Sequence, residues 1–123
     1  MSKVPQKTAV LVVEDEIVVR IQTVNLLQNE NLTVFQAKNI REASELLDIH
    51  NIEIVLLDIH LDDRKSGIDF ISEILEKNEQ AKIIMITNET SIDMVVTCMK
   101  KGAFYYTFKR EEEIDVSVRI VNK

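Results

Sequence analysis

Five short apolar runs, separated by longer amphipathic segments, most strongly constrain what this chain can fold into. Each run has five or six residues and is rich in β-branched or aromatic side chains, as β-strands are. The runs are Ala9–Val13, Leu32–Ala37, Ile52–Leu57, Lys82–Ile86 and Phe104–Phe108. Strict alternation of strands with helices predicts an α/β fold in which one parallel sheet carries helices on both faces. We therefore expect a doubly wound architecture with right-handed crossovers.

The segments between the runs have apolar residues at three- and four-residue spacing, which is typical of amphipathic helices. Asn39 stands three residues before Glu42, a spacing that predicts a reciprocal cap at the start of the second helix. Ser66 and Thr90 are the expected caps of the next two helices, and Gly102 is expected to end the fourth. The stripes predicted to be buried are Ile17, Ile21, Val24 and Leu27; Ile40, Ala43 and Leu47; Ile68, Ile71 and Leu75; and Ile92, Val95 and Met99.

The periodicity of the last segment is ambiguous. Ile114, Val118 and Val121 form a helical stripe, and the three glutamates before them suit the positive end of a helix. Val116 and Ile120 also alternate with polar residues, in phase with Ile114 and Val118, as in a strand. The pattern alone leaves helix and strand equally open here.

Length and composition restrict the class of protein. With 123 residues, the chain is predicted to form one domain that spans residues 1–123. Its formal net charge of −6 argues against direct binding of nucleic acid. Cys98 is the only cysteine, so no internal disulfide can form, and we expect it to be a small core residue. No apolar run reaches the roughly 18 residues that span a bilayer. We therefore expect no membrane contact and a cytoplasmic location.

Polar side chains stand where the predicted strands end. Glu14 and Asp15 follow the first run, and Asp58 follows the third. Thr87 and Lys109 follow the fourth and fifth runs. Ligands of open parallel sheets bind outside the carboxyl ends of the strands, so these side chains are expected to converge. A solvated helix start is the simpler interpretation of the acidic residues taken alone, but their joint position favours a shared site.

The expected charges favour a divalent cation and a phosphoryl group. Crowded carboxylates repel one another, and a divalent cation relieves that repulsion. An all-oxygen set of ligands suits Mg²⁺ or Mn²⁺, and one such cation with the ammonium of Lys109 balances three carboxylates. Asp58, at the end of a buried middle strand, is the predicted nucleophile of a phosphoryl transfer. Thr87 and Lys109 are expected to stabilise charge on the equatorial oxygens.

Four stretches of the sequence resemble the receiver domain of two-component response regulators. They are LVVEDE, IVLLDIHL, IIMITN and GAFYYTFK, and the resemblance covers about residues 8–121. It implies a CheY-like, flavodoxin-like (βα)5 domain with the strand order 2-1-3-4-5. It also implies that the ambiguous last segment is a helix.

The resemblance implies a role for each matching residue of the acidic site. Asp58 matches the aspartate that accepts a phosphoryl group from a phosphohistidine. Glu14 and Asp15 match the acidic pair that binds the metal together with this aspartate, and the backbone carbonyl of His60 matches a further metal ligand. Glu14 stands where aspartate is more usual, and we expect its additional methylene still to reach the metal.

Three further positions match residues that respond to phosphorylation. Thr87 matches the hydroxyl that turns toward the phosphoryl group, and Lys109 matches the lysine that pairs with it. Tyr106 matches the aromatic residue whose rotamer changes on the face of the fourth helix, fifth strand and fifth helix, although simple packing is its alternative role. A sensor histidine kinase or a histidine phosphotransfer protein is the implied partner. Homodimerisation through the same face is compatible with the resemblance.

The leading interpretation is a phosphoacceptor domain that switches conformation and does not turn over a diffusible substrate. Arg110 replaces a usual proline and Asn88 replaces a usual small residue, which leaves open a degenerate receiver that acts only as a protein-interaction module. A flavodoxin-like carrier is disfavoured, because the acidic residues after the first strand would repel a flavin phosphate. The sequence also leaves open whether the chain is a stand-alone regulator or part of a larger one.

Overall fold

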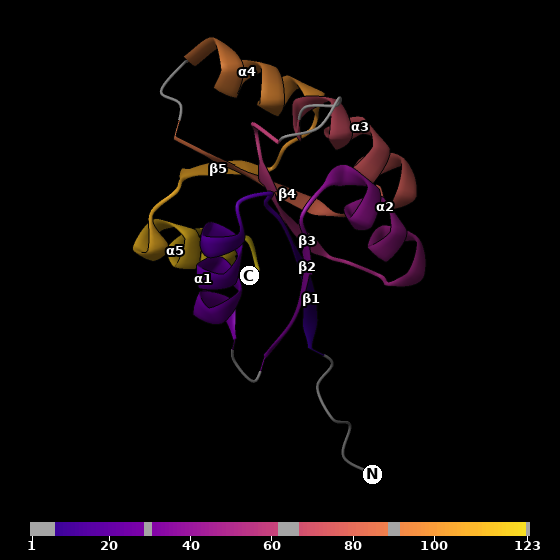
Figure 1. The fold of residues 1–123 in the computed structure, drawn as a ribbon. Helices are drawn as coiled ribbons and strands as arrows, with labels where there is room; N and C mark the ends of the chain where they lie inside the picture. Colours follow the sequence, from indigo (N-terminus) through magenta and orange to yellow (C-terminus); the bar gives the residue numbers. More distant parts are fainter. Residues whose placement is uncertain (1–6, 29–30, 62–66, 89–91, 123) are drawn as a thin grey trace.

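The computed structural model describes residues 7–28, 31–61, 67–88 and 92–122, in which strands and helices alternate (Figure 1). All five predicted strands are present, and the third begins two residues later than expected. No helix in these residues is both long and apolar enough to cross a membrane. The strands are β1 (Thr8–Val13), β2 (Leu32–Ala37), β3 (Ile54–Asp58), β4 (Lys82–Thr87) and β5 (Tyr105–Phe108). The helices are α1 (Ile17–Leu27), α2 (Ile40–Ile49), α3 (Gly67–Lys77), α4 (Ile92–Lys101) and α5 (Glu111–Val121).

The five strands form one parallel sheet in the order β2-β1-β3-β4-β5, as the resemblance implied. The register pairs Val13, the last residue of β1, with Ala37 on one side and Leu57 on the other. Asp58 pairs with Ile86 of β4. The carboxyl ends of neighbouring strands therefore lie along one edge of the sheet, where ligand sites of parallel sheets form.

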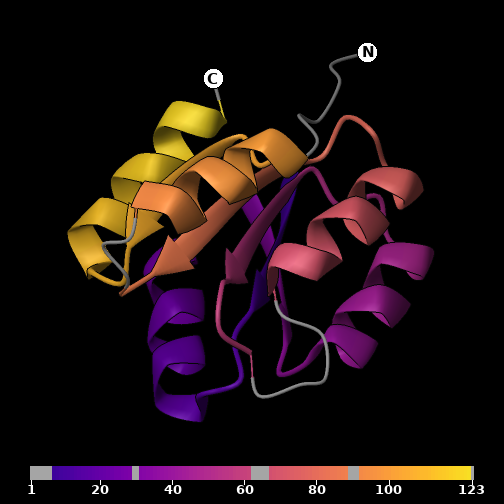
Figure 2. The ribbon, with the colours of Figure 1, turned by 90° about the horizontal axis from the view of Figure 1, so that it is seen from above.

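Helices cover both faces of the sheet (Figure 2). Helices α1 and α5 pack on one face, and α2, α3 and α4 pack on the other. Leu11 and Val13 of β1 belong to the core beneath α2, α3 and α4, whereas Val10 and Val12 belong to the core beneath α1 and α5. A strand buried on both faces has an apolar residue at every position, which is why the sequence marks β1 so clearly.

The predicted stripe of α1 is wrong in its first half. Val24 and Leu27 are buried, but Ile17 and Ile21 are 59% and 46% exposed. The buried side includes Thr23, whose hydroxyl donates to a backbone carbonyl within the helix. The buried side of α1 is therefore rotated away from the predicted apolar stripe. Residue spacing alone does not determine which side of a helix faces the sheet.

The predicted stripe of α4 is also wrong. Ile92 and Met99 are 77% and 41% exposed, and Val95 is only partly buried. Cys98 is the buried residue of this helix, which confirms its expected place in the core. Helix α4 lies at the margin of its layer beside α3, so only a narrow side of it meets the protein (Figure 1). Gly102 ends the helix as predicted, with φ at 114°, in the left-handed region that favours glycine.

The predicted cap of α2 is present in a modified form. The side chain of Asn39 accepts a hydrogen bond from the backbone N–H of Glu42 at 2.8 Å. The carboxylate of Glu42 accepts from the backbone N–H of Lys38 at 3.0 Å, one residue before the donor of a reciprocal cap. The predicted caps Ser66 and Thr90 lie outside the described residues.

The last segment is the helix α5, as the resemblance implied. Ile114, Val118 and Val121 are buried against the sheet, while Val116 and Ile120 are 44% and 48% exposed. A strand would place Ile114 and Ile120 on the same face. The residues buried in the core are those of the helical stripe, so the structure decides between helix and strand for this segment.

The helical assignment of the last segment can be tested by a pair of alanine substitutions. We expect Ile114→Ala to lower the free energy of unfolding by about 2–5 kcal/mol, because it leaves a cavity beneath α5. Ile120→Ala, on the exposed side, is the matched control and is expected to change it by no more than about 0.5 kcal/mol. Urea unfolding followed by circular dichroism measures both values. Equal losses for the two variants would contradict the assignment.

Candidate functional site

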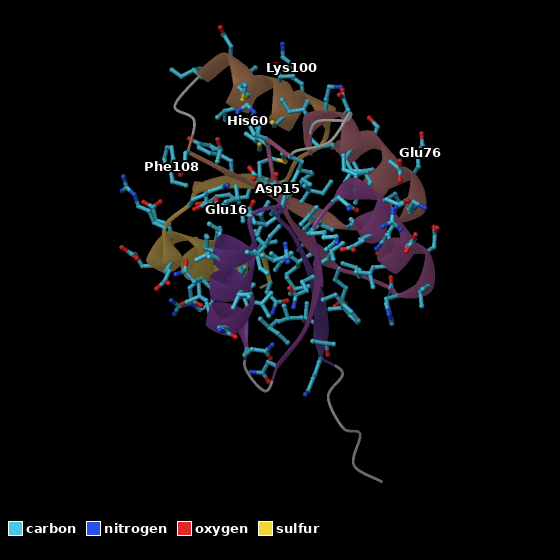
Figure 3. The ribbon with its side chains drawn as sticks, viewed as in Figure 1. Asp15, Glu16, His60, Glu76, Lys100 and Phe108 are labelled. Atoms are coloured by element: carbon cyan, nitrogen blue, oxygen red, sulfur yellow. The ribbon has the colours of Figure 1, made fainter. Side chains whose placement is uncertain are left out.

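The acidic residues predicted to form a site converge at the carboxyl edge of the sheet. Glu14 and Asp15 follow β1, and Asp58 is the last residue of β3. Each of the three offers a carboxylate oxygen within 4.8 Å of the other two. Glu14 and Asp58 are buried, and Asp15 is more accessible. Figure 3 shows Asp15 at this edge, with His60 in the loop after β3.

Lys109, which follows β5, bridges two of these carboxylates. Its Nζ atom lies 2.9 Å from Oε1 of Glu14 and 3.0 Å from Oδ2 of Asp58. Burial lowers the pKa of the Lys109 ammonium, but its hydrogen bonds to the two carboxylates outweigh burial and raise the pKa above its usual value. The lysine is therefore held in its charged form between β1 and β3.

The carboxyl group of Glu14 has an unusually high affinity for a proton. Burial raises its pKa from 4.5 to about 7, against the lowering effect of the hydrogen bond from Lys109. The negative charge of Asp58 adds to the rise. Three carboxyl groups thus lie beside the single ammonium of Lys109, and a further cation would relieve the repulsion between them once they are ionised.

Backbone N–H groups fix the direction of both buried carboxylates. Oδ1 of Asp58 accepts from the N–H of His60 at 3.1 Å, so that Oδ2 faces Lys109. Oε2 of Glu14 accepts from the N–H of Glu16 at 3.2 Å. The loops after β1 and β3 therefore orient these side chains, in addition to placing them.

Thr87 lies beside the cluster as the last residue of β4 and is 1% exposed. Its backbone carbonyl accepts from the N–H of Lys109 at 3.2 Å, which ties the ends of β4 and β5 together. The hydroxyl and the ammonium predicted to act together thus come from directly connected residues.

Tyr106 lies farther along β5, outside the acidic cluster. It is 41% exposed, and its ring meets the edge of Phe108 at a centroid distance of 6.3 Å. Asn88 is exposed, and the guanidinium of Arg110 lies 3.7 Å from Glu113 of α5. A groove beside Tyr106 is lined by the side chains of β5 and α5, among them Tyr105, Phe108 and Val116.

The donors of the cluster fit the predicted metal. Glu14, Asp15 and Asp58 offer carboxylate oxygens alone, which Mg²⁺ and Mn²⁺ prefer. The accessible position of Asp15 leaves one side of the cluster toward solvent, as a cation that keeps several waters requires.

Two residues that support the cluster, Gly67 and Arg20, are not among those predicted from the sequence. A Cβ added to Gly67 would lie 2.0 Å from the backbone oxygen of Asp58, so only glycine allows α3 to begin so close to β3. Arg20 donates to the backbone oxygen of Glu14 at 2.9 Å. A polar residue on the side of α1 that faces the sheet would have indicated a specific contact. The predicted stripe placed that side of the helix wrongly, so Arg20 was not recognised.

Comparison with known proteins identifies the family. The model of the response regulator receiver domain matches residues 10–120. This chain belongs to that family. The response regulator PilR of Pseudomonas aeruginosa is 33% identical over 99 residues, which cover 80% of this receiver chain and 22% of PilR. The receiver chain thus spans about a fifth of the length of this curated relative.

Solved structures agree with the receiver fold. The chemotaxis protein CheY4 of Vibrio cholerae has a TM-score of 0.86 and 23% identity, with 94% of this chain and 98% of CheY4 covered. A response regulator from Burkholderia pseudomallei has a TM-score of 0.80 and 26% identity, covering 94% of this chain and 73% of that one. That structure contains a phosphorylated aspartic acid, a calcium ion and citrate.

Without metal ions, the raised pKa of Glu14 predicts a loss of stability as the pH rises. The pKa is about 7 in the folded protein and 4.5 ordinarily, so between these values the folded state holds a proton that the unfolded chain has released. The contribution of this proton is complete below about pH 4.5 and is lost as the pH passes about 7. Glu14→Gln does not titrate and provides the reference.

We expect the free energy of unfolding of the wild type, minus that of Glu14→Gln, to fall as the pH rises from about 4.5 to about 7 and then to level off. The slope is at most about 1.4 kcal/mol per pH unit, the value for one proton. Urea titrations in the presence of a chelator measure this difference. A difference that does not depend on pH would refute the assignment to Glu14.

Gly67→Ala is expected to disturb the cluster from the backbone side. Because the new Cβ would overlap the backbone oxygen of Asp58, the start of α3 or the end of β3 must move. We expect the free energy of unfolding to fall by about 1–3 kcal/mol. Amide NMR shifts should change most at Asp58 and His60, whose mutual hydrogen bond depends on this backbone. Unchanged shifts at both residues would show that the close approach is unimportant.

Proposed function

We propose that Asp58 accepts a phosphoryl group from a phosphohistidine of a sensor histidine kinase or a histidine phosphotransfer protein. The observation that carries the proposal is the ammonium of Lys109, which lies within 3.0 Å of a carboxylate oxygen of both Glu14 and Asp58. A structural ion pair needs one carboxylate, whereas phosphoryl transfer needs a nucleophile next to concentrated positive charge. The phosphorylated aspartic acid of the Burkholderia pseudomallei regulator supports the same chemistry here.

The proposed step is an in-line displacement at phosphorus. An oxygen of Asp58 forms the new P–O bond, the P–N bond to the donor imidazole breaks, and the leaving nitrogen takes a proton from solvent. Lys109 moves from Oδ2 of Asp58 to an oxygen of the transferred group, and the hydroxyl of Thr87 donates to another. Both groups stabilise negative charge on the equatorial oxygens in the transition state, which lowers the barrier to phosphoryl transfer.

The metal site of the proposal consists of Glu14, Asp15 and Asp58, with the backbone carbonyl of His60 as a further ligand. The first three lie close enough together to share one ion. When bound there, Mg²⁺ or Mn²⁺ supplies positive charge that neutralises oxygens of the transferred group. Glu14 must give up its proton to serve as a ligand, so binding is expected to be weaker below about pH 7.

We propose that Thr87 and Tyr106 report phosphorylation to the face of α4, β5 and α5. The backbone bond between Thr87 and Lys109 connects the site to β5, which carries Tyr106. This face exposes apolar side chains that suit a protein partner or a second copy of the chain, among them Ile92, Tyr105 and Val116. A signalling domain of this kind carries out its own phosphorylation chemistry and turns over no diffusible substrate.

We further propose that residues 1–123 act as one receiver unit with its core at about 8–121, in keeping with the family match to residues 10–120. The acidic charge of the chain speaks against direct contact with nucleic acid. The cytoplasmic location and the absence of membrane contact stay predictions, because they depend on the whole protein.

Phosphorylation can be tested by intact-mass spectrometry with acetyl phosphate and Mg²⁺. We expect the wild type to gain the mass of one phosphoryl group, and Asp58→Asn to gain none. Asp93→Asn, which changes an exposed aspartate of α4, is the matched control and should behave as the wild type. Chelation of the metal before the reaction should abolish the gain.

Two results would reject the proposal. A gain that persists in Asp58→Asn would place the phosphoryl group on another residue. No gain from acetyl phosphate or from a phosphorylated histidine protein would favour a degenerate receiver that only binds other proteins.

A further inference from the structure

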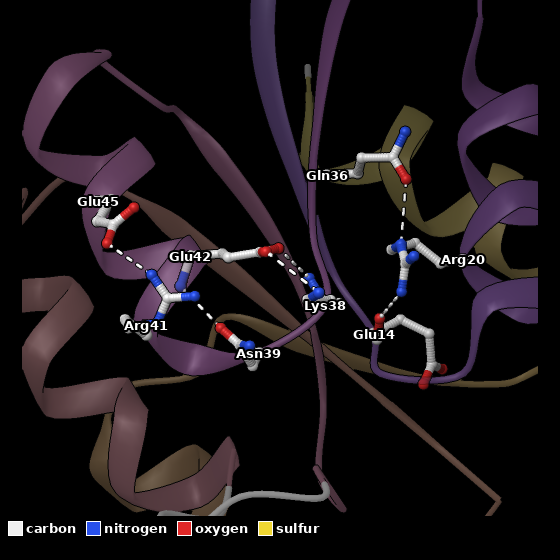
Figure 4. Close-up of polar contacts among 8 residues, drawn as sticks. All are labelled: Glu14, Arg20, Gln36, Lys38, Asn39, Arg41, Glu42 and Glu45. Carbon is white, nitrogen blue, oxygen red and sulfur yellow. Dashed lines mark hydrogen bonds and ion pairs between the residues drawn. The ribbon is translucent and has the colours of Figure 1, made fainter.

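Arg20 makes contacts that the proposed chemistry does not account for. Its Nη1 atom donates to the backbone oxygen of Glu14 at 2.9 Å, and its Nε atom donates to the side-chain oxygen of Gln36 at 3.1 Å. Figure 4 shows the guanidinium of Arg20 between these two acceptors. One side chain of α1 thus connects the residue that follows β1 with strand β2.

We propose that Arg20 is a positioning residue for the cation site. It holds the main chain of Glu14, whose carboxylate is one of the proposed metal ligands. The inference rests on the proposed function, because it assigns Arg20 to the metal site of that proposal. Arg20 holds the backbone carbonyl of Glu14, and its second hydrogen bond to Gln36 holds the guanidinium itself in place. The residue touches neither the reacting atoms nor the carboxylate that would bind the metal.

The length of the Glu14 side chain explains why its backbone needs such support. A glutamate has one more rotatable bond than an aspartate, so a small rotation of its backbone moves the carboxylate farther. The N–H of Glu14 is bonded to the oxygen of Ala37 at 3.0 Å, and Arg20 fixes the carbonyl on the other side. With both peptide groups held, the carboxylate can stay beside Asp58 despite its length.

The sign of the effect separates positioning from simple electrostatics. A positive charge repels a cation that binds near it, so an Arg20 that acted only through its charge would weaken Mg²⁺ binding. Arg20→Ala would then strengthen Mg²⁺ binding. A positioning Arg20 has the opposite effect, because its loss releases Glu14. The two roles of the residue therefore predict shifts of Mg²⁺ affinity in opposite directions.

The test is a titration of the full chain with MgCl₂, followed by the amide NMR shifts of Asp15 and His60. We expect the dissociation constant of Arg20→Ala for Mg²⁺ to rise about 10-fold, the usual cost of losing a residue that supports a metal ligand. Arg20→Lys keeps one donor for the carbonyl of Glu14 and should recover part of this loss. Arg41→Ala removes an arginine of α2 that pairs with Glu45, and should leave the affinity unchanged.

Two further measurements exclude a general structural effect. At saturating Mg²⁺, Arg20→Ala should be phosphorylated by acetyl phosphate at nearly the wild-type rate, because Arg20 touches no reacting atom. In metal-free protein, amide hydrogen exchange should become faster in Arg20→Ala at residues 14–16 and stay unchanged in Arg41→Ala.

The outcomes distinguish a failure of this inference from a failure of the proposed function. Unchanged or stronger Mg²⁺ binding by Arg20→Ala would overturn the positioning role and leave the proposed function intact. A rate that stays low at saturating Mg²⁺ would assign Arg20 to the chemistry and would also overturn the positioning role. A wild-type chain that binds no Mg²⁺ would overturn the metal site itself, together with this inference.

Discussion

The ammonium of Lys109 between Glu14 and Asp58 is the interaction on which the site depends. Lys109 follows β5, Glu14 follows β1 and Asp58 ends β3. The interaction therefore connects three strands that are far apart in the sequence. Two buried carboxylates without this cation would repel each other and would have to take up protons. The lysine therefore keeps charged groups at a buried position, where their interactions with a further charge are strong because water screens them little.

The pairing of the strands in the sheet positions Lys109 relative to Asp58. Strand β4 lies between β3 and β5, so the distance from Asp58 to Lys109 is set by two steps of parallel pairing. The central strands are buried on both faces, and a shift of register by one residue would exchange the two cores of the protein. The apolar core thus holds the polar site in place, although no apolar side chain belongs to it.

The sequence predicts the strands and the convergence of the acidic side chains well, because both follow from local rules. A strand buried on both faces must be apolar throughout, and the residue after it, such as Glu14, must lie at the sheet edge. The inner sides of α1 and α4 were predicted wrongly, since the position of a helix over the sheet depends on packing across the whole layer. The contact of Arg20 with Glu14 was missed for the same reason, because it exists only once α1 has its true orientation.

If Asp58 is phosphorylated as proposed, the same ion pair would transmit the change to other parts of the molecule. Lys109 cannot keep its bond to Oδ2 of Asp58 and also pair with a phosphoryl group on that oxygen, so the bridge must be exchanged. The N–H of Lys109 is bonded to the carbonyl of Thr87, and a movement of the lysine therefore acts on the ends of both β4 and β5. Because Tyr106 lies on β5 and is 41% exposed, the proposed change of its rotamer would not require the core to open. Phosphorylation would increase the negative charge at Asp58, so Lys109 would keep an anionic partner after the exchange.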